Sequence, residues 1–369
     1  MDNTGFCGHV VIYTDAGGVG GAEISAANLV AATLATSQTR FTVVGVATEV
    51  VAAIAAGHDQ VDQIVLDGPL RMLDHWRTFR RLAPDIIHLN LCTPWAGATA
   101  LAAAFCTPAR VVRVDQLPLR TTDLIPLLRT RLLSLRVDAH VAVGQGAATL
   151  MENFYALGRG SVIAIPNGVP DRSPNAQPPK VTGPLHIGSV GRLDPMKGHD
   201  LLLRAIAQVP DATLTILGEG GWRSHLEQMA QDLGVAERVA LPGWVNPQDH
   251  PSQFDVVVQP SRSEGFPLAI VEAMLAARPV VAMRVGSVAE AVRHGETGLL
   301  VAKNDVAGLV AALQQMQQPG VAARLGQRGR AVAAQQMTAV VMATAYGRLW
   351  QQLCDRPRAP RFWVGRPKD

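Results

Sequence analysis

Short apolar runs alternate with longer helical patterns along most of this chain of 369 residues. The first run is His9–Thr14 (HVVIYT), and the alanine-rich stretch after it, Ala22–Thr36, has the pattern of a helix. Runs that are apolar on both faces and separated by helices are typical of a parallel sheet covered by helices on both sides. The alternation therefore predicts an α/β fold. Further predicted strands of the first half are Phe41–Val46, Ile64–Leu66, Asp85–Leu89, Val111–Val114, Ala139–Val143 and Val162–Ile165.

A proline-rich segment without periodicity, Pro170–Pro184, interrupts this alternation and has the composition of a linker. The alternation then restarts, and the chain is long enough for two cores. We therefore expect two domains, with ligands bound where the carboxyl ends of the strands meet helix N-termini. The elements predicted after the linker are His186–Val190, Gly198–Gln208, Thr213–Leu217, Trp222–Leu233, Val239–Leu241, Val256–Gln259, Pro267–Ala277, Val280–Ala282, Val306–Gln317, Gly320–Gln336 and Thr338–Arg356.

The composition excludes several classes of protein. Hydrophobic residues make up 48% of the chain and charged residues 17%, which is typical of a folded globular protein. The net charge of +3 is too small to indicate a nucleic-acid partner. The cysteines at 7, 92, 106 and 354 form no CxxC pair, which favours reduced thiols in a cytosolic protein. We expect no secretory signal in Met1–Gly8 and no transmembrane helix.

The stretch Ser261–Pro279 (SRSEGFPLAIVEAMLAARP) places two carboxylates around a predicted helix start. Pro267 suits the first position of a helix, because its missing N–H has no partner to lose there. The loop at Gly265–Phe266 would then offer backbone N–H groups to an anionic phosphate, with Glu264 before the helix and Glu272 inside it. The alternative is that Glu264 caps the helix and Glu272 is a solvated surface residue.

Two further loops follow predicted strands. Arg192 and Lys197 lie in the loop Ser189–Gly198 (SVGRLDPMKG). An arginine can hold two phosphate oxygens in a fork and a lysine acts as a mobile point charge, although two solvated loop cations would look the same. The strand ending at Leu217 leads into glycines at 218, 220 and 221, which would let a ligand approach the backbone closely.

Together these stretches resemble family 4 of the retaining glycosyltransferases, which have the GT-B fold. The similar segments are Arg192–Gly198, Leu217–Gly220 (LGEG), Glu264–Glu272, Ile165–Val169 (IPNGV) and Val285–Val301 (VGSVAEAVRHGETGLLV). The resemblance implies two Rossmann-like domains that face each other across a cleft. Their expected bounds are residues 1–175 for the acceptor side and 183–337 for the nucleotide-sugar side, with a last helix at about 338–356 that returns to the first domain.

The resemblance also implies roles for individual residues. Arg192 and Lys197 would hold the donor diphosphate, Glu264 the hydroxyls of the transferred sugar, and Glu272 the nucleotide ribose. The base would lie near the loop Pro242–Val245, where Trp244 either flanks it or packs in the interior. The remaining implied donor contacts are Gly218, Val245, Gly265, Phe266, Pro267 and Leu268.

In the first half, Asp15–Glu23 (DAGGVGGAE) does not fit a dinucleotide-binding loop, because Glu23 stands where the third glycine is needed. The arrangement is instead similar to the family's N-terminal loop, which implies donor contacts at Gly18, Gly20 and Gly21 and an acceptor-side position for Glu23. The alternative is a plain glycine turn that leads into a helix.

Two more residues of the first half are candidates. His88 ends a predicted strand and would point into the cleft on the acceptor side, although a lone histidine there is more often structural. Asp115 stands where many relatives have a histidine near the donor sugar, which makes it a candidate catalytic residue and puts the usual sugar contacts in doubt. A turn or capping aspartate is the alternative.

Arginines are interleaved with leucines in Leu124–Arg136 (LIPLLRTRLLSLR), and a second basic group is formed by arginines 71, 77, 80 and 81. An amphipathic basic surface of this kind can bind an anionic membrane, as it does in many relatives with lipid-linked acceptors. A half-buried helix and a site for an acidic glycan are the alternatives.

The resulting expectation is a retaining, metal-independent glycosyltransferase without an organic cofactor, which uses a UDP- or GDP-sugar as co-substrate. Its acceptor would be a glycan, a lipid-linked molecule or a small molecule, and its place the cytoplasm or the inner face of the membrane. Rival functions are a sugar-nucleotide epimerase of the same fold, a glycan phosphorylase, an inactive nucleotide-sugar-binding scaffold and, more distantly, an oxidoreductase.

Overall fold

The computed structural model describes residues 6–69, 71–245 and 251–357, and the chain folds into two compact units. The first unit contains the described residues up to Ala142, Ala148–Ile165 and the chain from Met342 onward. The second unit contains Val143–Ala147 and Pro166–Val341. Each unit is built on one sheet whose recorded strand pairs are all parallel.

The sheet of the first unit has seven strands in the order β3-β2-β1-β4-β5-β6-β7. The order reverses between β1 and β4, because the chain first builds outward through β2 and β3 and then returns to build the other half. The strands are β1 (His9–Tyr13), β2 (Arg40–Gly45), β3 (Val61–Val65), β4 (Ile86–Leu91), β5 (Arg110–Asp115), β6 (Ala139–Ala142) and β7 (Val162–Ala164).

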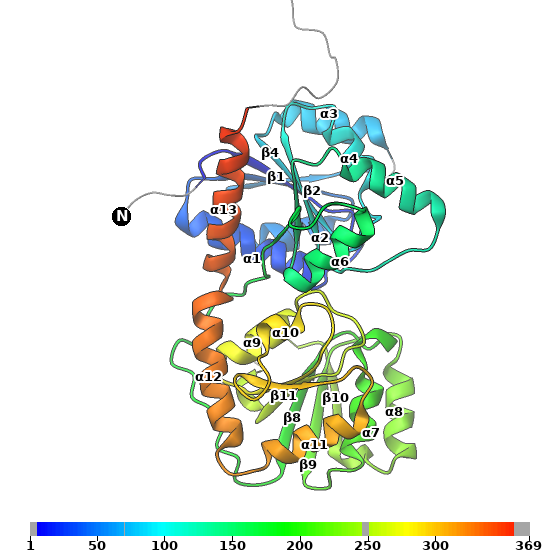
Figure 1. Ribbon diagram of the computed structural model, residues 1–369, viewed down its shortest axis with the longest axis vertical. Coiled ribbons are helices and arrows are strands. Elements are labelled where there is room, and N and C mark those ends of the chain that lie inside the picture. Colours follow the sequence, from blue (N-terminus) through cyan, green and yellow to red (C-terminus); the bar gives the residue numbers. More distant parts are fainter. Residues whose placement is uncertain (1–5, 70, 246–250, 358–369) are drawn as a thin grey trace, which may run out of the picture. The chain divides into compact units, whose positions relative to one another are not determined.

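Helices connect consecutive strands of this sheet, and α1 contacts α2 while α3 contacts α4 (Figure 1). Phe79 of α3 and Leu101 of α4 join Tyr13 and Leu89 of the sheet in one apolar cluster. The helices are α1 (Gly21–Thr36), α2 (Thr48–Ala55), α3 (Met72–Leu82), α4 (Ala98–Ala104), α5 (Leu124–Ser134) and α6 (Gln145–Tyr155).

The last helix, α13 (Ala339–Asp355), packs on the first unit. Its Trp350 is fully buried and makes edge contacts with Phe6 and Phe41, at ring-centroid distances of 5.9 and 6.1 Å. A buried tryptophan covers a large apolar area, so this side chain fixes the end of the chain against the sheet.

The sheet of the second unit has six strands in the order β10-β9-β8-β11-β12-β13. Here the order reverses between β8 and β11. The strands are β8 (Leu185–Val190), β9 (Ala212–Leu217), β10 (Val239–Gly243), β11 (Val256–Gln259), β12 (Val280–Met283) and β13 (Gly298–Val301). The helices are α7 (His199–Ile206), α8 (Arg223–Asp232), α9 (Leu268–Leu275), α10 (Val288–Ala291), α11 (Val306–Met316) and α12 (Val321–Gln336).

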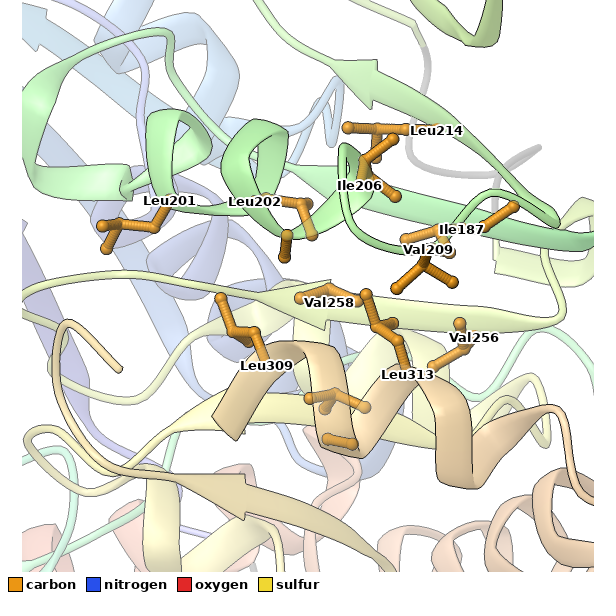
Figure 2. Packing of buried hydrophobic residues seen from close by; sticks show 14 of the residues in the cluster. Ile187, Leu201, Leu202, Ile206, Val209, Leu214, Val256, Val258, Leu309 and Leu313 are labelled. Carbon is orange, nitrogen blue, oxygen red and sulfur yellow. The ribbon is translucent and has the colours of Figure 1, made fainter. Parts of the chain in front are cut away.

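Figure 2 shows the apolar layer between one face of this sheet and helices α7 and α11. Leu309 and Leu313 lie one helical turn apart on α11 and meet Val256 and Val258, which alternate along β11. Residues two apart on a strand and four apart on a helix share a face, which explains why Val256 and Val258, and Leu309 and Leu313, point to one side of their element. Helix α9 packs on α12, and Ala322 and Leu325 of α12 belong to this apolar layer.

The predicted α/β fold is confirmed, and the structure corrects it in three places. The strand β3 begins at Val61, three residues before the predicted start. The prediction missed these residues because Asp62 and Gln63 of this edge strand are exposed and interrupt the apolar pattern. Helix α10 and strand β13, each of four residues, were not predicted. Pro267 is the N-cap residue of α9 and precedes the helix. No helix among the described residues is long and apolar enough to cross a membrane.

Candidate active site

The loops after β8 and β11 leave the same edge of the sheet at the point where the strand order reverses. β8 is followed by Gly191–Gly198 and β11 by Pro260–Pro267, and the two strands are neighbours. In open parallel sheets this is where ligands bind, because the two chains diverge to opposite sides and leave room between their loops. The structure therefore brings the predicted residues Arg192, Lys197 and Glu264 to one edge.

Arg262 joins these two loops. Its backbone N–H donates to the carbonyl of Met196 at 2.7 Å, and its guanidinium donates to the carbonyl of Pro195 at 2.7 Å. The same guanidinium holds both carboxylate oxygens of Asp200 at 2.7 Å. These hydrogen bonds to Asp200 raise the pKa of Arg262 above its ordinary value. A forked arginine pair of this kind fixes geometry as well as charge, so the two loops form one rigid structure.

Glu264 is buried and forms an ion pair with Lys197, whose Nζ lies 2.7 Å from Glu264 Oε1. The same oxygen accepts hydrogen bonds from Gln259 Nε2 at 2.9 Å and Ser261 Oγ at 2.7 Å. Helix α9 has no side-chain cap, so the interpretation of Glu264 as a helix cap is wrong. Gln259 and Ser261 were not among the predicted site residues, although their positions at and after the end of β11 were a signal that could have identified them.

The backbone N–H groups of Gly265, Phe266 and Leu268 have no hydrogen-bond acceptor in the described part of the chain. The carbonyl groups are engaged instead, since Gly265 O accepts from Ser287 N at 3.0 Å and Phe266 O from Asn167 Nδ2 at 3.4 Å. These three residues are buried, with Phe266 4% exposed, so the loop is less open than predicted. Unpaired N–H groups at a helix start form a site for an anion.

Glycines allow the loops of this edge to pack backbone against backbone. A Cβ on Gly218, whose φ is +148°, would lie 2.1 Å from the carbonyl oxygen of Gly191. A Cβ on Gly286, whose φ is +52°, would lie 1.8 Å from the carbonyl oxygen of Glu264. The prediction that Gly218 makes room for a ligand is therefore corrected, because the loop of Gly191 already occupies that room.

Arg192 lies at the surface, with 70% of its side chain exposed, and pairs with Asp194 at 3.0 Å. Asp194 also accepts from the backbone N–H groups of Met196 and Lys197. An exposed pair of this kind contributes little to stability. Arg192 can therefore exchange Asp194 for an anionic ligand at little cost.

Glu272 lies inside α9 and is partly buried, and this burial raises its pKa to about 7. The positive charge of Arg172 opposes the shift without cancelling it. The interpretation of Glu272 as a solvated surface residue is therefore wrong. A buried carboxyl group with a pKa this far from its ordinary value is a candidate for a functional site, because such shifted groups cluster at functional sites.

Comparisons with known proteins identify the family of this chain. Residues 184–318 match the family described as glycosyl transferases group 1. A GDP-mannose-dependent alpha-(1-6)-phosphatidylinositol monomannoside mannosyltransferase of Mycolicibacterium smegmatis is 31% identical over 270 residues, which cover 64% of this chain and 70% of the relative. The chain belongs to the group 1 glycosyltransferases. A D-inositol 3-phosphate glycosyltransferase of Mycobacterium marinum is 37% identical over 155 residues, 40% of this chain and only 33% of that protein.

Solved structures show that this glycosyltransferase has the GT-B fold. Anabaena HepE, crystallised with UDP, superposes with a TM-score of 0.80 at 21% identity and covers 93% of this chain and 100% of its own. Sucrose-phosphate synthase from Thermosynechococcus elongatus gives a TM-score of 0.80 at 21% identity over 94% of this chain and 99% of its own. At such identities the likeness shows the fold alone.

In this glycosyltransferase Trp244 and Val245 follow β10 at the same edge of the sheet. Trp244 is 71% exposed, so the alternative that it packs in the interior is wrong. A large exposed aromatic ring at the carboxyl edge of the sheet is suited to stacking on a flat ligand.

In the first unit, the loop with Gly18, Gly20 and Gly21 leads into α1. Glu23 lies in the first turn of this helix. Glu23 Oε2 accepts from the backbone N–H of Gly20 at 2.9 Å, and burial raises the pKa of this carboxyl group. Gly18 and Gly21 are exposed. Glu23 thus binds the backbone of the N-cap residue Gly20, which is the role of the N3 residue in a capping box.

His88 does not point into a cleft as predicted. It is 1% exposed, and its ring packs on Tyr346 and Trp350 at centroid distances of 5.1 and 5.9 Å. Burial lowers its pKa to about 3, so the imidazole is neutral. The side chain points to the face of β4 that α13 covers, and its role is packing.

Asp115 is 1% exposed and has partners within the first unit. One oxygen pairs with Arg113 Nε at 3.2 Å and the other accepts from the hydroxyl of Tyr155 at 2.6 Å. Burial of the phenol raises the pKa of Tyr155, which keeps it a donor. The prediction of a catalytic Asp115 is not supported, because its carboxylate is used to neutralise a buried arginine. Residues two apart on a strand share a face, so Arg113–Val114–Asp115 carried this signal.

Proposed function

We propose that this glycosyltransferase moves a hexosyl group from a nucleoside-diphosphate sugar to an acceptor with retention of anomeric configuration. The observation that carries the proposal is the ion pair between Lys197 and Glu264 beside the unpaired N–H groups that precede α9. A cation and a helix start at this edge suit the diphosphate and the negative charge that develops on it as it leaves. The buried carboxylate suits the hydroxyls of the sugar.

Each part of the donor has a proposed partner in the second unit. Arg192, Lys197 and the N–H groups of Gly265 would stabilise the leaving diphosphate, which makes a divalent metal unnecessary. Glu264 would accept hydrogen bonds from the sugar and Glu272 from the ribose. Trp244 would flank the base, because its ring is exposed at the carboxyl edge of the sheet.

The donor is expected to be a UDP- or GDP-sugar. The mannosyltransferase of Mycolicibacterium smegmatis is named for GDP-mannose, and HepE was crystallised with UDP and with UDP-glucose. We expect one class among UDP-, GDP- and ADP-sugars to raise the melting temperature selectively, since a ligand that binds only the folded state stabilises it in proportion to ln(1 + [L]/Kd).

Four outcomes of this screen and its follow-up would contradict the proposal. No stabilisation by any sugar nucleotide would refute donor binding. NMR of the product would refute retention if the new glycosidic bond were inverted. Release of a rearranged free sugar without any acceptor would identify an epimerase, and binding without transfer or donor hydrolysis would identify an inactive scaffold.

We also propose that helix α5 binds an anionic membrane surface and so brings the enzyme to a lipid-linked acceptor. Ile125 is 79% exposed, and Leu132 and Leu135 are 67% and 68% exposed. The exposed arginines 120, 129 and 136 border this apolar surface. Exposed aliphatic side chains beside cations suit the boundary between lipid head groups and acyl chains. The arginines of α3 contribute less, because Arg71 and Arg77 pair with Asp74.

Replacing Ile125 and Leu132 with serine is expected to weaken vesicle binding by on the order of tenfold or more. The measurement is co-sedimentation with phosphatidylcholine vesicles, with and without phosphatidylglycerol. Ile163→Ser, which alters an exposed side chain of β7, is the matched control. Equal binding to both vesicle types, or retention on an acidic glycan instead, would contradict a membrane role.

A further inference from the structure

We infer that Gln259 and Ser261 are positioning residues that hold Glu264 so that only its Oε2 is offered to a ligand. The inference deepens the proposed function and rests on it for the role of Glu264. It concerns two side chains that contact no ligand themselves. Both are buried, with Gln259 2% and Ser261 0% exposed.

The hydrogen bonds around Glu264 are all directed to one oxygen. Oε1 accepts from Lys197 Nζ at 2.7 Å, from Ser261 Oγ at 2.7 Å and from Gln259 Nε2 at 2.9 Å. In the described part of the chain, Oε2 accepts no hydrogen bond. A carboxylate oxygen has two lone pairs, so three donors saturate Oε1 and leave Oε2 as the acceptor for a substrate hydroxyl.

The direction of each proton in this cluster is fixed by chemistry. The amide of Gln259 has two N–H groups, and its Nε2 lies 2.7 Å from Ser261 Oγ and 2.9 Å from Glu264 Oε1. Ser261 Oγ thus accepts from Gln259, and its single O–H donates to Glu264. Gln259 therefore orients the hydroxyl of Ser261, and this hydroxyl in turn orients the carboxylate of Glu264.

Gln259 keeps this arrangement although its own carbonyl is unsatisfied. Its Oε1 is buried and has no hydrogen-bond partner. A buried unpaired acceptor is destabilising, and an apolar side chain at the end of β11 would avoid it. A glutamine at this position is explained if both of its side-chain N–H groups are needed. A residue that leaves a buried polar atom unpaired is typical of a functional site.

The test removes each donor and measures the carboxylate directly. In Ser261→Ala and Gln259→Met, the NMR chemical shift of the Glu264 side-chain carboxyl carbon is expected to change, because its Oε1 loses a hydrogen-bond donor. The measurement uses protein labelled at the glutamate side-chain carboxyl carbon, with Glu264→Gln assigning the signal. Ser261→Thr keeps the hydroxyl and should restore the wild-type chemical shift. Ser134→Ala, at a buried serine of the first unit, is the matched control.

A binding measurement then separates positioning from general damage. UDP-glucose and GDP-mannose are the probes, with UDP and GDP as references that lack the sugar. We expect both variants to lose about tenfold in affinity for the sugar nucleotide that the wild type binds and to keep the affinity for its nucleoside diphosphate.

An unchanged chemical shift of the Glu264 carboxyl carbon in both variants would overturn the inference, as would equal losses for the sugar nucleotide and its nucleoside diphosphate. If the wild type binds neither probe while the chemical shift changes as expected, the donor assignment fails and the positioning of Glu264 stands.

Discussion

Replacing Lys197 with methionine is expected to lower kcat/KM for glycosyl transfer by about 10²-fold or more. Methionine keeps much of the length of the side chain and removes the charge that we assign to the leaving diphosphate. A steady-state assay with the donor found by the screen measures the change. Lys303→Met, at an exposed position of the second unit, is the matched control and should retain full activity.

The same variant tests the ion pair, because it leaves Glu264 without its cation. Removing one partner of a buried pair costs more than replacing both, so Lys197→Met should destabilise the protein by about 1–3 kcal/mol. Adding Glu264→Gln should recover much of this stability and none of the activity. Recovery of activity in the double variant, or full activity in Lys197→Met alone, would refute the assignment of Lys197 to the donor.

Replacing Glu272 with glutamine is expected to stabilise the ligand-free protein above pH 7 by about 3 kcal/mol, since the pKa rises from 4.5 to about 7 and one pKa unit corresponds to about 1.4 kcal/mol. Burial raises the pKa of Glu272 in the folded state to about 7, from an ordinary value of 4.5. Below pH 4.5 the carboxyl is protonated in both states and costs nothing. As the pH rises from 4.5 to 7 the unfolded state ionises first, so the wild type loses stability that the variant keeps.

Urea unfolding followed across this pH range measures the difference. The gap between Glu272→Gln and the wild type should open above pH 4.5 and reach its plateau above pH 7. Glu237→Gln, at an exposed position, should show no such gap. Affinity for the nucleotide should fall in Glu272→Gln, because a carboxylate accepts hydrogen bonds from ribose hydroxyls more strongly than an amide does. A pH-independent difference would show that desolvation of this carboxyl is not the cause.

Much of the candidate site could be predicted from the sequence because it depends on where charged residues follow the strands. Arg192, Lys197 and Glu264 each follow a predicted strand, and parallel strands end at one edge. The Lys197–Glu264 contact itself could not be predicted, since it depends on β8 and β11 being neighbours although β9 and β10 separate them in the chain.

The first unit was harder to predict for the same physical reason. His88 was predicted from its place at a strand end and Asp115 from the family resemblance, yet both are buried by partners distant in the sequence, Trp350 for one and Tyr155 for the other. Whether a polar side chain faces solvent or a covering element depends on which helix packs on that face of the sheet. A strand pattern that is apolar on both faces does not contain this information.

The sequence by itself determined the α/β alternation, because strand and helix periods of two and 3.6 are local properties of the backbone. It also determined which loops carry the charged residues. Only the tertiary structure decided which of those charges are available to a ligand. Three donors saturate one oxygen of Glu264, and the other oxygen accepts no hydrogen bond from the residues that the structure describes. Burial and hydrogen bonding are set by contacts between distant segments, and these contacts exist only in the folded chain.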